Sequence, residues 1–215
     1  MGMAGILAIA TQDYAEKWFF CIQSHIRYAA RYGHEYRLHA DSAAGLHPKW
    51  GKFIFTINML RTSDYVMLVD ADAEFSAQAP DFVGLMQSHP DHDLLYAAGN
   101  SGRLNSGVLM MRGGADSKAV AILEHCLANR DIPVPPEDFV TAEGENGHLI
   151  HAIKRPEFAA AVCEVERLWN CTHSAEYERA HIRHYTNELG NAFREGRVRP
   201  EGAPRKSLLG LLKRA

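Results

Sequence analysis

The chain has 215 residues and a formal net charge of −3, a length that suits one full-sized domain with a tail. Hydrophobic residues make up 47%, aromatic residues 9% and charged residues 23% of the chain, values near the average for soluble globular proteins, which argues against disorder and coiled coil. The slightly acidic balance, with a pI near 6.4, argues against a nucleic-acid binder, which would present a broad basic field. We therefore expect a sizeable core and no nucleic-acid partner.

The cysteines and the N-terminal segment indicate the cellular compartment. The four cysteines form no CxxC pair and have no zinc-finger spacing, so they are interpreted as reduced thiols and indicate neither a zinc site nor a disulfide scaffold. The N-terminal segment lacks a basic region and a signal-peptide core, and no apolar run approaches the ~18 residues of a membrane span. A cytoplasmic protein is expected.

The first sixty residues alternate between strand and helix patterns. The short apolar run at residues 5–11 predicts a strand that is buried on both faces. Over residues 13–31 the larger apolar side chains recur every four positions, which predicts an amphipathic helix that Gly33 ends. Alternating residues at 35–40 predict a short strand, and helical spacing predicts a helix over 50–60.

The remaining elements continue this alternation. The most apolar short run, residues 65–69, predicts a central strand that ends directly in acidic residues. Further strands are expected at 94–98, 108–111 and 163–168, and further helices at 115–130 and 137–153. The pattern predicts an α/β fold with a mostly parallel, mixed central sheet flanked by helices on both faces.

Asp70 and Asp72 follow the central strand, at the edge where open α/β sheets bind ligands. Residues i and i+2 of an extended segment point the same way, so both carboxylates can converge on one ligand. Two buried acids repel each other and lose solvation unless a cation compensates, and carboxylate oxygens suit Mg²⁺ or Mn²⁺. Solvated turn acids are the alternative that this motif alone leaves open.

Five segments together carry a resemblance to a known family. They are GILAIATQDY at 5–14, WGK at 50–52, YVMLVDADAEF at 65–75, NSGVLMMR at 105–112 and HIRHYTN at 181–187. Their order resembles that in GT-A-fold glycosyltransferases, above all the small nucleotide-sugar transferases related to glycogenin, the bacterial lipopolysaccharide galactosyltransferases and the family 34 galactosyl/mannosyltransferases. The resemblance spans about residues 5–190. It implies a metal-dependent hexosyltransferase that uses a UDP-sugar donor and a saccharide or other hydroxyl acceptor, retains the anomeric configuration and acts in surface polysaccharide synthesis.

In such enzymes the first strand and the turn after it hold the uridine. The resemblance therefore implies that Ala10, Thr11 and Tyr14 contact the base and ribose, with the Tyr14 ring stacked on the base. It also implies that Lys52 lies near the nucleotide or its phosphates. The structural alternatives are that Tyr14 is the first core residue of its helix and that Lys52 is a solvated cation.

The resemblance also implies a metal site. Asp70 and Asp72, with Ala71 between them, match the DxD that binds metal and nucleotide diphosphate, and His184 matches the histidine that completes the metal site. A divalent cation stabilises the charge that develops on the leaving diphosphate, and a histidine ligand favours Mn²⁺ over Mg²⁺ because imidazole is softer than a carboxylate oxygen. His181 competes with His184 for this role, and either is alternatively a surface residue.

Asn105, Ser106 and Gly107 match the NSG motif that contacts the donor sugar, where a glycine permits close approach because it has no Cβ. An ordinary turn before the strand at 108–111 is the alternative. Trp169 and Asn170 resemble a pair that shapes the sugar pocket, since an indole offers a flat apolar face to sugars. A core tryptophan is the equal alternative.

Glu145 and Asn146 lie where relatives carry an acid followed by glutamine near the anomeric carbon. Together with Asn105, they are the expected catalytic residues. Glu143 is an equally near acid, and Glu145 or Glu143 is the base or nucleophile candidate if the mechanism is not a direct retaining transfer. A polar helix face is the structural alternative.

The chain departs from the family pattern after His184, where no lysine is placed to hold the diphosphate, and Arg183 or Arg194 is the candidate substitute. Residues 194–215 carry seven basic and two acidic residues, so we expect a basic tail after a transferase domain at 1–193. A short basic amphipathic helix there would rest peripherally on anionic lipid at the inner face of the membrane. A disordered terminus is favoured, because short isolated helices are marginal in water.

Two other function classes remain open. A strand that ends in DxD also opens haloacid-dehalogenase-type phosphohydrolases, in which the first acid, here Asp70, is the nucleophile. Those enzymes place threonine or valine two residues after the second acid, where this chain has Glu74. The second alternative is a non-catalytic UDP-sugar-binding module, because a fold can keep its motifs after activity is lost.

Overall fold

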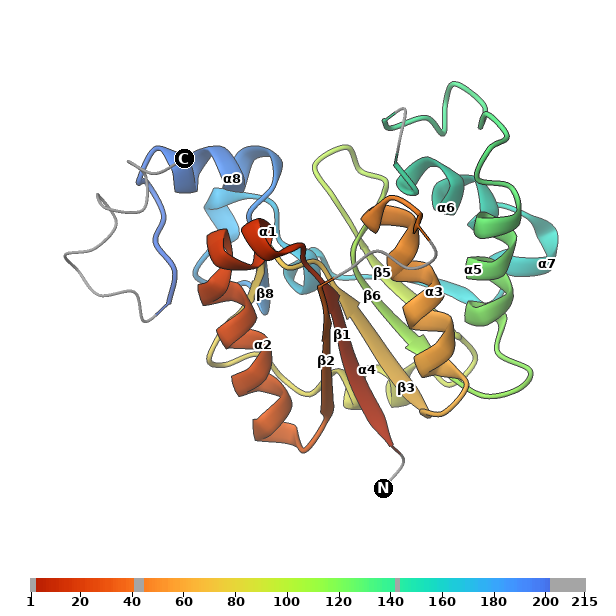
Figure 1. Ribbon diagram of the computed structural model, residues 1–215, viewed down its shortest axis with the longest axis horizontal. Coiled ribbons are helices and arrows are strands. Elements are labelled where there is room, and N and C mark those ends of the chain that lie inside the picture. Colours follow the sequence, from red (N-terminus) through yellow and green to blue (C-terminus); the bar gives the residue numbers. More distant parts are fainter. Residues whose placement is uncertain (1–2, 41–44, 142–143, 202–215) are drawn as a thin grey trace.

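A six-stranded sheet runs through the computed structural model, which describes residues 3–40, 45–141 and 144–201 (Figure 1). Its strands are β1 (Ala4–Ile9), β2 (Glu35–His39), β3 (Tyr65–Val69), β5 (Leu94–Ala98), β6 (Leu104–Arg112) and β7 (Val162–Val165). The strand order is β2-β1-β3-β6-β5-β7, with β6 antiparallel to both of its neighbours and every other neighbouring pair parallel. The expected mostly parallel, mixed sheet is confirmed.

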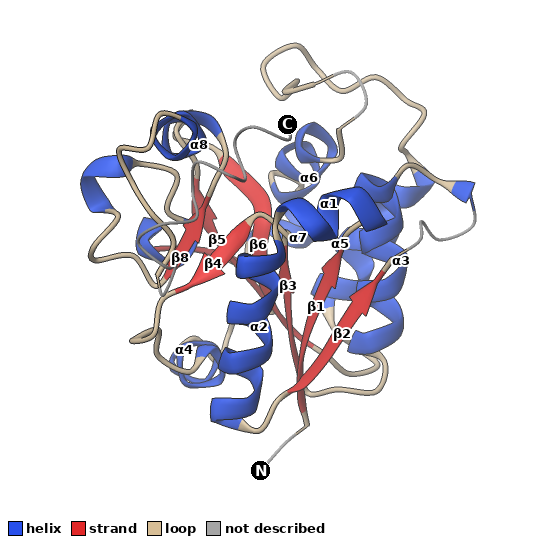
Figure 2. Cartoon of the chain, turned by 60° about the vertical axis from the view of Figure 1, so that its left-hand side comes forward, coloured by secondary structure: helices blue, strands red, loops and turns tan. Residues whose placement is uncertain are grey.

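A two-stranded antiparallel sheet and the helices complete the architecture (Figure 2). The small sheet pairs β4 (Ala73–Phe75) with β8 (Ile182–His184). The longer helices are α2 (Phe19–Tyr32), α3 (Pro48–Leu60) and α5 (Lys118–Ala128). The shorter ones are α1 (Gln12–Lys17), α4 (Phe82–Ser88), α6 (Asn146–Ile153), α7 (Pro156–Ala159) and α8 (Asn187–Arg194).

The sheet separates two hydrophobic cores, because successive strand residues point to opposite faces. Leu7 and Leu68 pack in a cluster with residues of α3, α5 and α6. Ile6 and Met67, one position earlier on the same strands, pack in a second cluster with residues of α2 and α4. Figure 1 shows α2 on one side of the sheet and α3 and α5 on the other. The apolar runs of β1 and β3 are therefore explained by burial on both faces.

The single helix expected at residues 13–31 is wrong, since the chain forms α1 and α2 with a break at Trp18. Trp18 leaves helical geometry, at φ −106° and ψ 25°, and its ring stacks on that of Tyr185 with the ring centroids 5.7 Å apart. An exact four-residue repeat also drifts around a helix of 3.6 residues per turn. Ile26, which belongs to that repeat, is accordingly 43% exposed. The expected helix end is confirmed, because Gly33 takes the left-handed conformation at φ 72°.

Two further boundaries differ from expectation. The helix expected at 137–153 begins only at Asn146, because the side chain of Asp138 is buried in a turn where it pairs with His151 and Lys154. The strand expected at 108–111 begins already at Leu104, so the Asn-Ser-Gly motif lies inside β6 and is not the turn before it.

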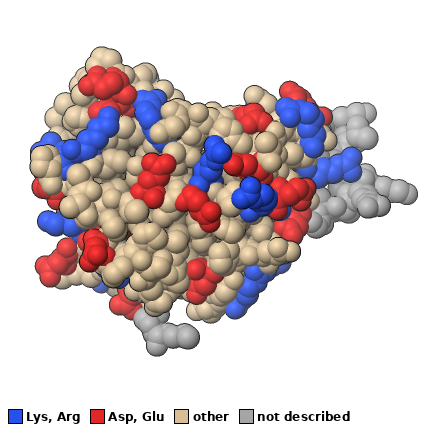
Figure 3. Space-filling model, turned by 180° about the vertical axis from the view of Figure 1, so that it is seen from behind, with Lys and Arg blue, Asp and Glu red and all other residues tan. Residues whose placement is uncertain are grey.

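The described surface adds two observations. No helix within the described ranges is both long and apolar enough to cross a bilayer. Acidic and basic side chains are interspersed on the face seen in Figure 3, so its described part presents no broad field of one sign. The lipid-binding helix expected in the tail, at residues 204–215, lies outside the described residues.

The fully buried His25 predicts a stability that falls in mild acid. Its Nε2 lies 2.6 Å from the carbonyl oxygen of Ala73, and burial lowers the pKa of His25 to about 4. Because the unfolded chain keeps the ordinary value near 6.5, it binds more protons than the folded protein between those pH values. We expect His25 to remove about 3 kcal/mol of stability as the pH falls from 6.5 to 4. Urea unfolding of wild type and His25→Gln across this range measures it, and equal pH slopes would contradict it.

Candidate active site

A cavity of about 520 Å³ opens where β1 and β3 end, between the first residues of α3 and α6 and the start of β6. Ligand sites of open α/β sheets form at this edge. The sequence-predicted residues that line it are Ala10, Thr11, Tyr14, Lys52, Asp70, Ala71, Asp72, Asn105, Ser106, Glu145, Asn146 and His184. Residues more than a hundred positions apart in the chain thus share one cavity.

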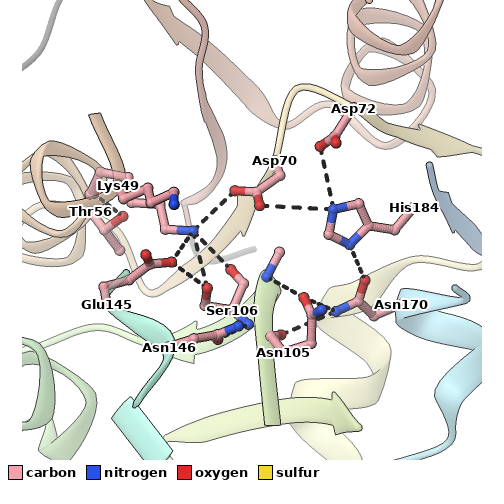
Figure 4. Close-up of polar contacts among 12 residues, drawn as sticks. Lys49, Thr56, Asp70, Asp72, Asn105, Ser106, Glu145, Asn146, Asn170 and His184 are labelled. Carbon is pink, nitrogen blue, oxygen red and sulfur yellow. Dashed lines mark hydrogen bonds and ion pairs between the residues drawn. The ribbon is translucent and has the colours of Figure 1, made fainter. Parts of the chain in front are cut away.

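Asp70, Asp72 and His184 come together because the small sheet pairs the segment after β3 with β8. Ala73 lies opposite His184 in this pairing, and the backbone N–H of Asp70 donates to the carbonyl oxygen of Gly107 at 2.8 Å. His184 Nε2 lies 3.3 Å from an Asp72 carboxylate oxygen and 3.9 Å from one of Asp70 (Figure 4). Ligand atoms of the three side chains all lie within 4.8 Å of one another. Two carboxylates and one imidazole at this spacing fit a divalent cation, and they suit Mn²⁺ better than a set of carboxylates alone.

Burial and the neighbouring charges shift the pKa values of the two carboxylates in this cluster. Burial, with repulsion from Asp72 and Glu145, raises the pKa of Asp70 even though Lys52 and His184 oppose the shift. Burial also raises that of Asp72, but the charge and hydrogen bond of His184 outweigh it and leave the pKa of Asp72 below its ordinary value. A bound cation would offset both the burial and the mutual repulsion of these two carboxylates.

Lys52 is the second centre of charge in the cavity and is only 5% exposed. Its Nζ donates to Asp70 at 3.1 Å, lies 2.7 Å from the carboxylate of Glu145, and donates to the hydroxyl of Ser106 at 3.2 Å. The two carboxylates raise the pKa of Lys52 although burial alone lowers it. The alternative of a solvated lysine is wrong, since this cation is buried and paired.

Glu145 and the amide residues line the side of the cavity formed by β6 and α6. Glu145 is 4% exposed and accepts from the hydroxyl of Ser106 as well as pairing with Lys52. Burial raises its pKa, but Lys52 and Ser106 outweigh this and bring the pKa of Glu145 below the ordinary value. Asn146 Oδ1 accepts from the backbone N–H of Ser106 at 2.8 Å. Glu143 lies outside the described residues.

Ala10 and Thr11, in the turn between β1 and α1, and Tyr14, in α1, also line the cavity. Tyr14 remains 39% exposed, so it is not the buried first residue of a helix core. Burial of its hydroxyl and the charges of Asp72 and Asp70 raise the pKa of Tyr14. Its position is compatible with a planar ligand entering from solvent.

Three predicted sugar contacts lie behind the wall of the cavity. Gly107, Trp169 and Asn170 are not among the described residues that line the cavity. Trp169 is 2% exposed and packs in the core beside His181, as the core alternative stated. Asn170 is fully buried against His184, and a Cβ on Gly107 would lie 2.1 Å from a carbon of the His184 ring. The missing Cβ of Gly107 therefore makes room for the imidazole.

The structure also resolves the choice between the histidines. His181 pairs with Glu166 at 3.2 Å and is not part of the metal-like cluster, so His184 is the candidate ligand. Arg183 is buried and pairs with Glu201 at 2.9 Å on the other side of β8, where it cannot take the place of the absent family lysine. Arg194 instead donates to Asn191 on its own helix.

Sequence reasoning missed three polar residues of the cavity: His47, Lys49 and Thr186. His47 caps α3, where its Nδ1 accepts from the backbone N–H of Lys49 at 3.3 Å. The exposed Lys49 lies one turn before the buried Lys52. The segment His-Pro-Lys before the matched Trp-Gly-Lys was the available signal, since proline favours a first helical position.

Gly107→Ala is expected to displace the His184 ring, because the new Cβ would meet its Cε1 at 2.1 Å and its Nδ1 at 2.5 Å. Overpacking of this kind costs about 1–3 kcal/mol, and we expect Mn²⁺ affinity to fall with it. Gly84→Ala is the matched control, since a Cβ there meets nothing within 4 Å and alanine in a helix stabilises by up to about 1 kcal/mol. Urea unfolding and Mn²⁺ titration of both variants measure the effect. A Gly107→Ala protein as stable as wild type, with undiminished Mn²⁺ affinity, would contradict it.

No protein-family model matches the chain, and no curated protein matches it. Solved structures do match. A glycosyltransferase involved in glycosylation of the major capsid of the virus PBCV-1 has a TM-score of 0.65 at 13% identity, over 88% of this chain and 97% of that one. The glycosyltransferase GlyE of Streptococcus pneumoniae has a TM-score of 0.59 at 14% identity, over 86% and 54% of the two chains. The bifunctional glycosyltransferase WbbM has a TM-score of 0.59 at 10% identity, over 99% and 52%. The chain therefore has the GT-A fold of these glycosyltransferases.

Proposed function

We propose that the protein is a metal-dependent glycosyltransferase that moves a hexose from a UDP-sugar to an acceptor hydroxyl. The observation that carries this proposal is the convergence of Asp70, Asp72 and His184 in one cavity of a glycosyltransferase fold. The proposed acceptor is a saccharide hydroxyl, in keeping with the surface polysaccharide synthesis that the resemblance in sequence implies.

In the proposed donor complex, Tyr14 stacks on the uracil while Ala10 and Thr11 contact the base and ribose. All three line the cavity, Ala10 and Thr11 from the turn after β1 and Tyr14 from α1. A divalent cation held by Asp70, Asp72 and His184 would stabilise the negative charge of the leaving diphosphate. Mn²⁺ is the proposed ion because the donor set includes an imidazole.

Residues on the β6 and α6 side orient the sugar. Asn105, Ser106 and Asn146 line the cavity there, and Asn146 is held by the backbone of Ser106. Amide side chains can donate to sugar oxygens and accept from hydroxyls at the same time. This placement supports Asn105 and Asn146 as the groups that position the anomeric carbon for transfer.

The ion pair and the lowered pKa of Glu145 support a reaction that retains the anomeric configuration. Of the carboxylates among the described lining residues, Asp70 and Asp72 belong to the metal-like cluster and Glu145 is paired with Lys52 at 2.7 Å. A carboxylate whose pKa is lowered in this way is a weak base for an acceptor hydroxyl. The leaving diphosphate would then accept the acceptor's proton on the face from which it departs, and the sugar keeps its configuration. Glu145 accordingly acts by holding Lys52 and Ser106.

The proposal is tested by incubating the protein and Mn²⁺ with UDP-hexoses and a panel of saccharide acceptors. Formation of a glycoside, with the donor's anomeric configuration in its proton NMR spectrum, is expected. An inverted product would contradict retention. Binding of UDP-sugars without product from any acceptor would favour the non-catalytic module, and hydrolysis of phosphate esters lost in Asp70→Asn would favour the phosphohydrolase.

A further inference from the structure

Asn170 is a fully buried polar residue that lies between two groups of the candidate active site without lining it. It ends the short 3₁₀ turn Arg167–Asn170. The next residue, Cys171, donates from its N–H to Ile182 and accepts from the N–H of His184, at 2.9 and 2.8 Å. These two bonds fix the backbone of Asn170 beside β8, so its side chain has a defined place next to the His184 ring.

The orientation of the Asn170 amide follows from its partners. One end of the amide lies 3.1 Å from the backbone carbonyl oxygen of Asn105, which can only accept, so this end is the NH₂ group. The NH₂ group also donates to Asn105 Oδ1 at 3.2 Å. The opposite end is therefore the carbonyl Oδ1, and it lies 2.9 Å from Nδ1 of His184. An amide carbonyl only accepts, so Nδ1 of His184 must carry a proton.

The proton on Nδ1 determines which nitrogen of His184 can bind a metal ion. With Nδ1 protonated and turned toward Asn170, Nε2 faces the carboxylates of Asp72 and Asp70 at 3.3 and 3.9 Å. A metal-ligating imidazole needs a lone pair on the nitrogen that faces the ion, and it is commonly held by a hydrogen bond at the other nitrogen. Asn170 supplies that hydrogen bond.

The same amide fixes Asn105. Oδ1 of Asn105 accepts from the backbone N–H of Gly107 at 2.9 Å and from the NH₂ group of Asn170 (Figure 4). The backbone N–H can only donate, so this end of the Asn105 side chain is the oxygen. The NH₂ group of Asn105, a residue that lines the cavity, is thereby turned away from this network. We call the four connected groups, Gly107 N–H, Asn105, Asn170 and His184, the amide relay.

We propose that Asn170 is a positioning residue that sets the metal-facing nitrogen of His184 and the amide of Asn105 at the same time. This inference rests on the proposed function for the role of the metal and sugar, although the hydrogen bonds themselves do not. Through the amide relay, the ligand of the diphosphate-bound cation and the donor to the sugar are held in one rigid unit. Burial of Asn170 keeps water from competing for either hydrogen bond.

Two substitutions separate the two roles of Asn170. Asn170→Leu has a similar size but neither donor nor acceptor, so His184 loses its partner and we expect Mn²⁺ affinity to fall about 10–100-fold. Asn170→Asp keeps an acceptor for Nδ1–H, so we expect it to bind Mn²⁺ within about 3-fold of wild type. It lacks the NH₂ group that holds Asn105, so its glycosyl transfer falls although the metal binds. His181→Asn is the control histidine variant and leaves Mn²⁺ affinity unchanged.

Affinity is measured from the electron paramagnetic resonance signal of free Mn²⁺ during titration of each folded variant. Wild-type affinity in Asn170→Leu would overturn the proposal, and so would an Asn170→Asp protein that binds as weakly as Asn170→Leu. A wild-type protein that binds no Mn²⁺ would contradict the proposed function instead.

The hydrogen bond between Asn170 and His184 is tested separately, by observing the Nδ1–H proton in ¹⁵N-histidine-labelled, metal-free protein at neutral pH. A slowly exchanging Nδ1–H proton of His184, identified by its loss in His184→Gln, is expected in wild type and Asn170→Asp and absent in Asn170→Leu. An unprotonated Nδ1 in wild type would overturn the relay.

Discussion

Asp72→Ala is expected to lower hexose transfer by about 10³-fold while leaving the fold intact. The substitution removes one of the two carboxylates that the cation needs, and with it the stabilisation of the leaving diphosphate. Asp72 is 8% exposed, and its carboxylate lies 3.3 Å from His184, which holds the pKa of Asp72 below its ordinary value. A carboxylate with a lowered pKa stabilises the folded protein, so we expect the variant's free energy of unfolding without metal to fall below that of wild type while the protein still folds.

Initial rates with a UDP-sugar and Mn²⁺, together with urea unfolding, measure both parts of this prediction. Asp91→Ala is the matched control, because Asp91 is an exposed acid in a turn and does not line the cavity. It should leave both the rate and the stability unchanged. A rate for Asp72→Ala within a factor of about ten of wild type would show that the carboxylate is not part of the reaction machinery.

Lys52→Met is expected to destabilise the protein by about 3–5 kcal/mol, because it leaves the buried carboxylate of Glu145 and the half-buried carboxylate of Asp70 without their cation. Lys52 Nζ lies 3.1 Å from Asp70 and 2.7 Å from Glu145, and Glu145 is 4% exposed. Methionine keeps the length of the side chain, so loss of packing contributes little. The double variant Lys52→Met/Glu145→Gln should recover part of the loss, since it removes one of the uncompensated charges.

Urea unfolding at pH 7 of the single and double variants gives these free energies. Lys49→Met is the matched control on the same helix, because its exposed side chain should contribute less than about 0.5 kcal/mol. A loss below about 1 kcal/mol in Lys52→Met would show that the lysine is not the counter-ion of Glu145 and Asp70.

The parts of the fold that the sequence predicted depend on local patterns. The apolar run that became β3 is buried on both faces, and Gly33 ends α2 because it alone among nearby residues adopts a positive φ without cost. The break at Trp18 was missed because it depends on packing against Tyr185, which is distant in sequence. Hydrophobic spacing describes one helix face and contains no information about a ring that must reach another element.

In the candidate site, too, some residues were predictable from local sequence and others depend on tertiary structure. The pair Asp70 and Asp72 was predictable from its place directly after a buried strand, although the expected extended segment is a turn in which the N–H of Ala73 donates to the carbonyl oxygen of Asp70 at 3.0 Å. The choice of His184 over His181 was not, because it is made by the pairing of β8 with β4. The resemblance implied that Asn170 contacts the sugar, but its burial against His184 follows from tertiary structure alone. Pairings between distant segments decide which polar residues face a cavity and which support those that do.

The most direct test of the donor site is thermal unfolding of the wild-type protein with UDP, GDP, CDP or ADP, each with and without Mn²⁺. A ligand present at about a hundred times its Kd adds ~2.7 kcal/mol, or roughly 5–10 °C in Tm for a domain of this size. We expect this shift with UDP and Mn²⁺ together, and we expect Asp72→Ala to lose it. Equal Tm values with every nucleotide, with and without the metal, would contradict the proposal that Asp70, Asp72 and His184 form a metal-dependent UDP-sugar site.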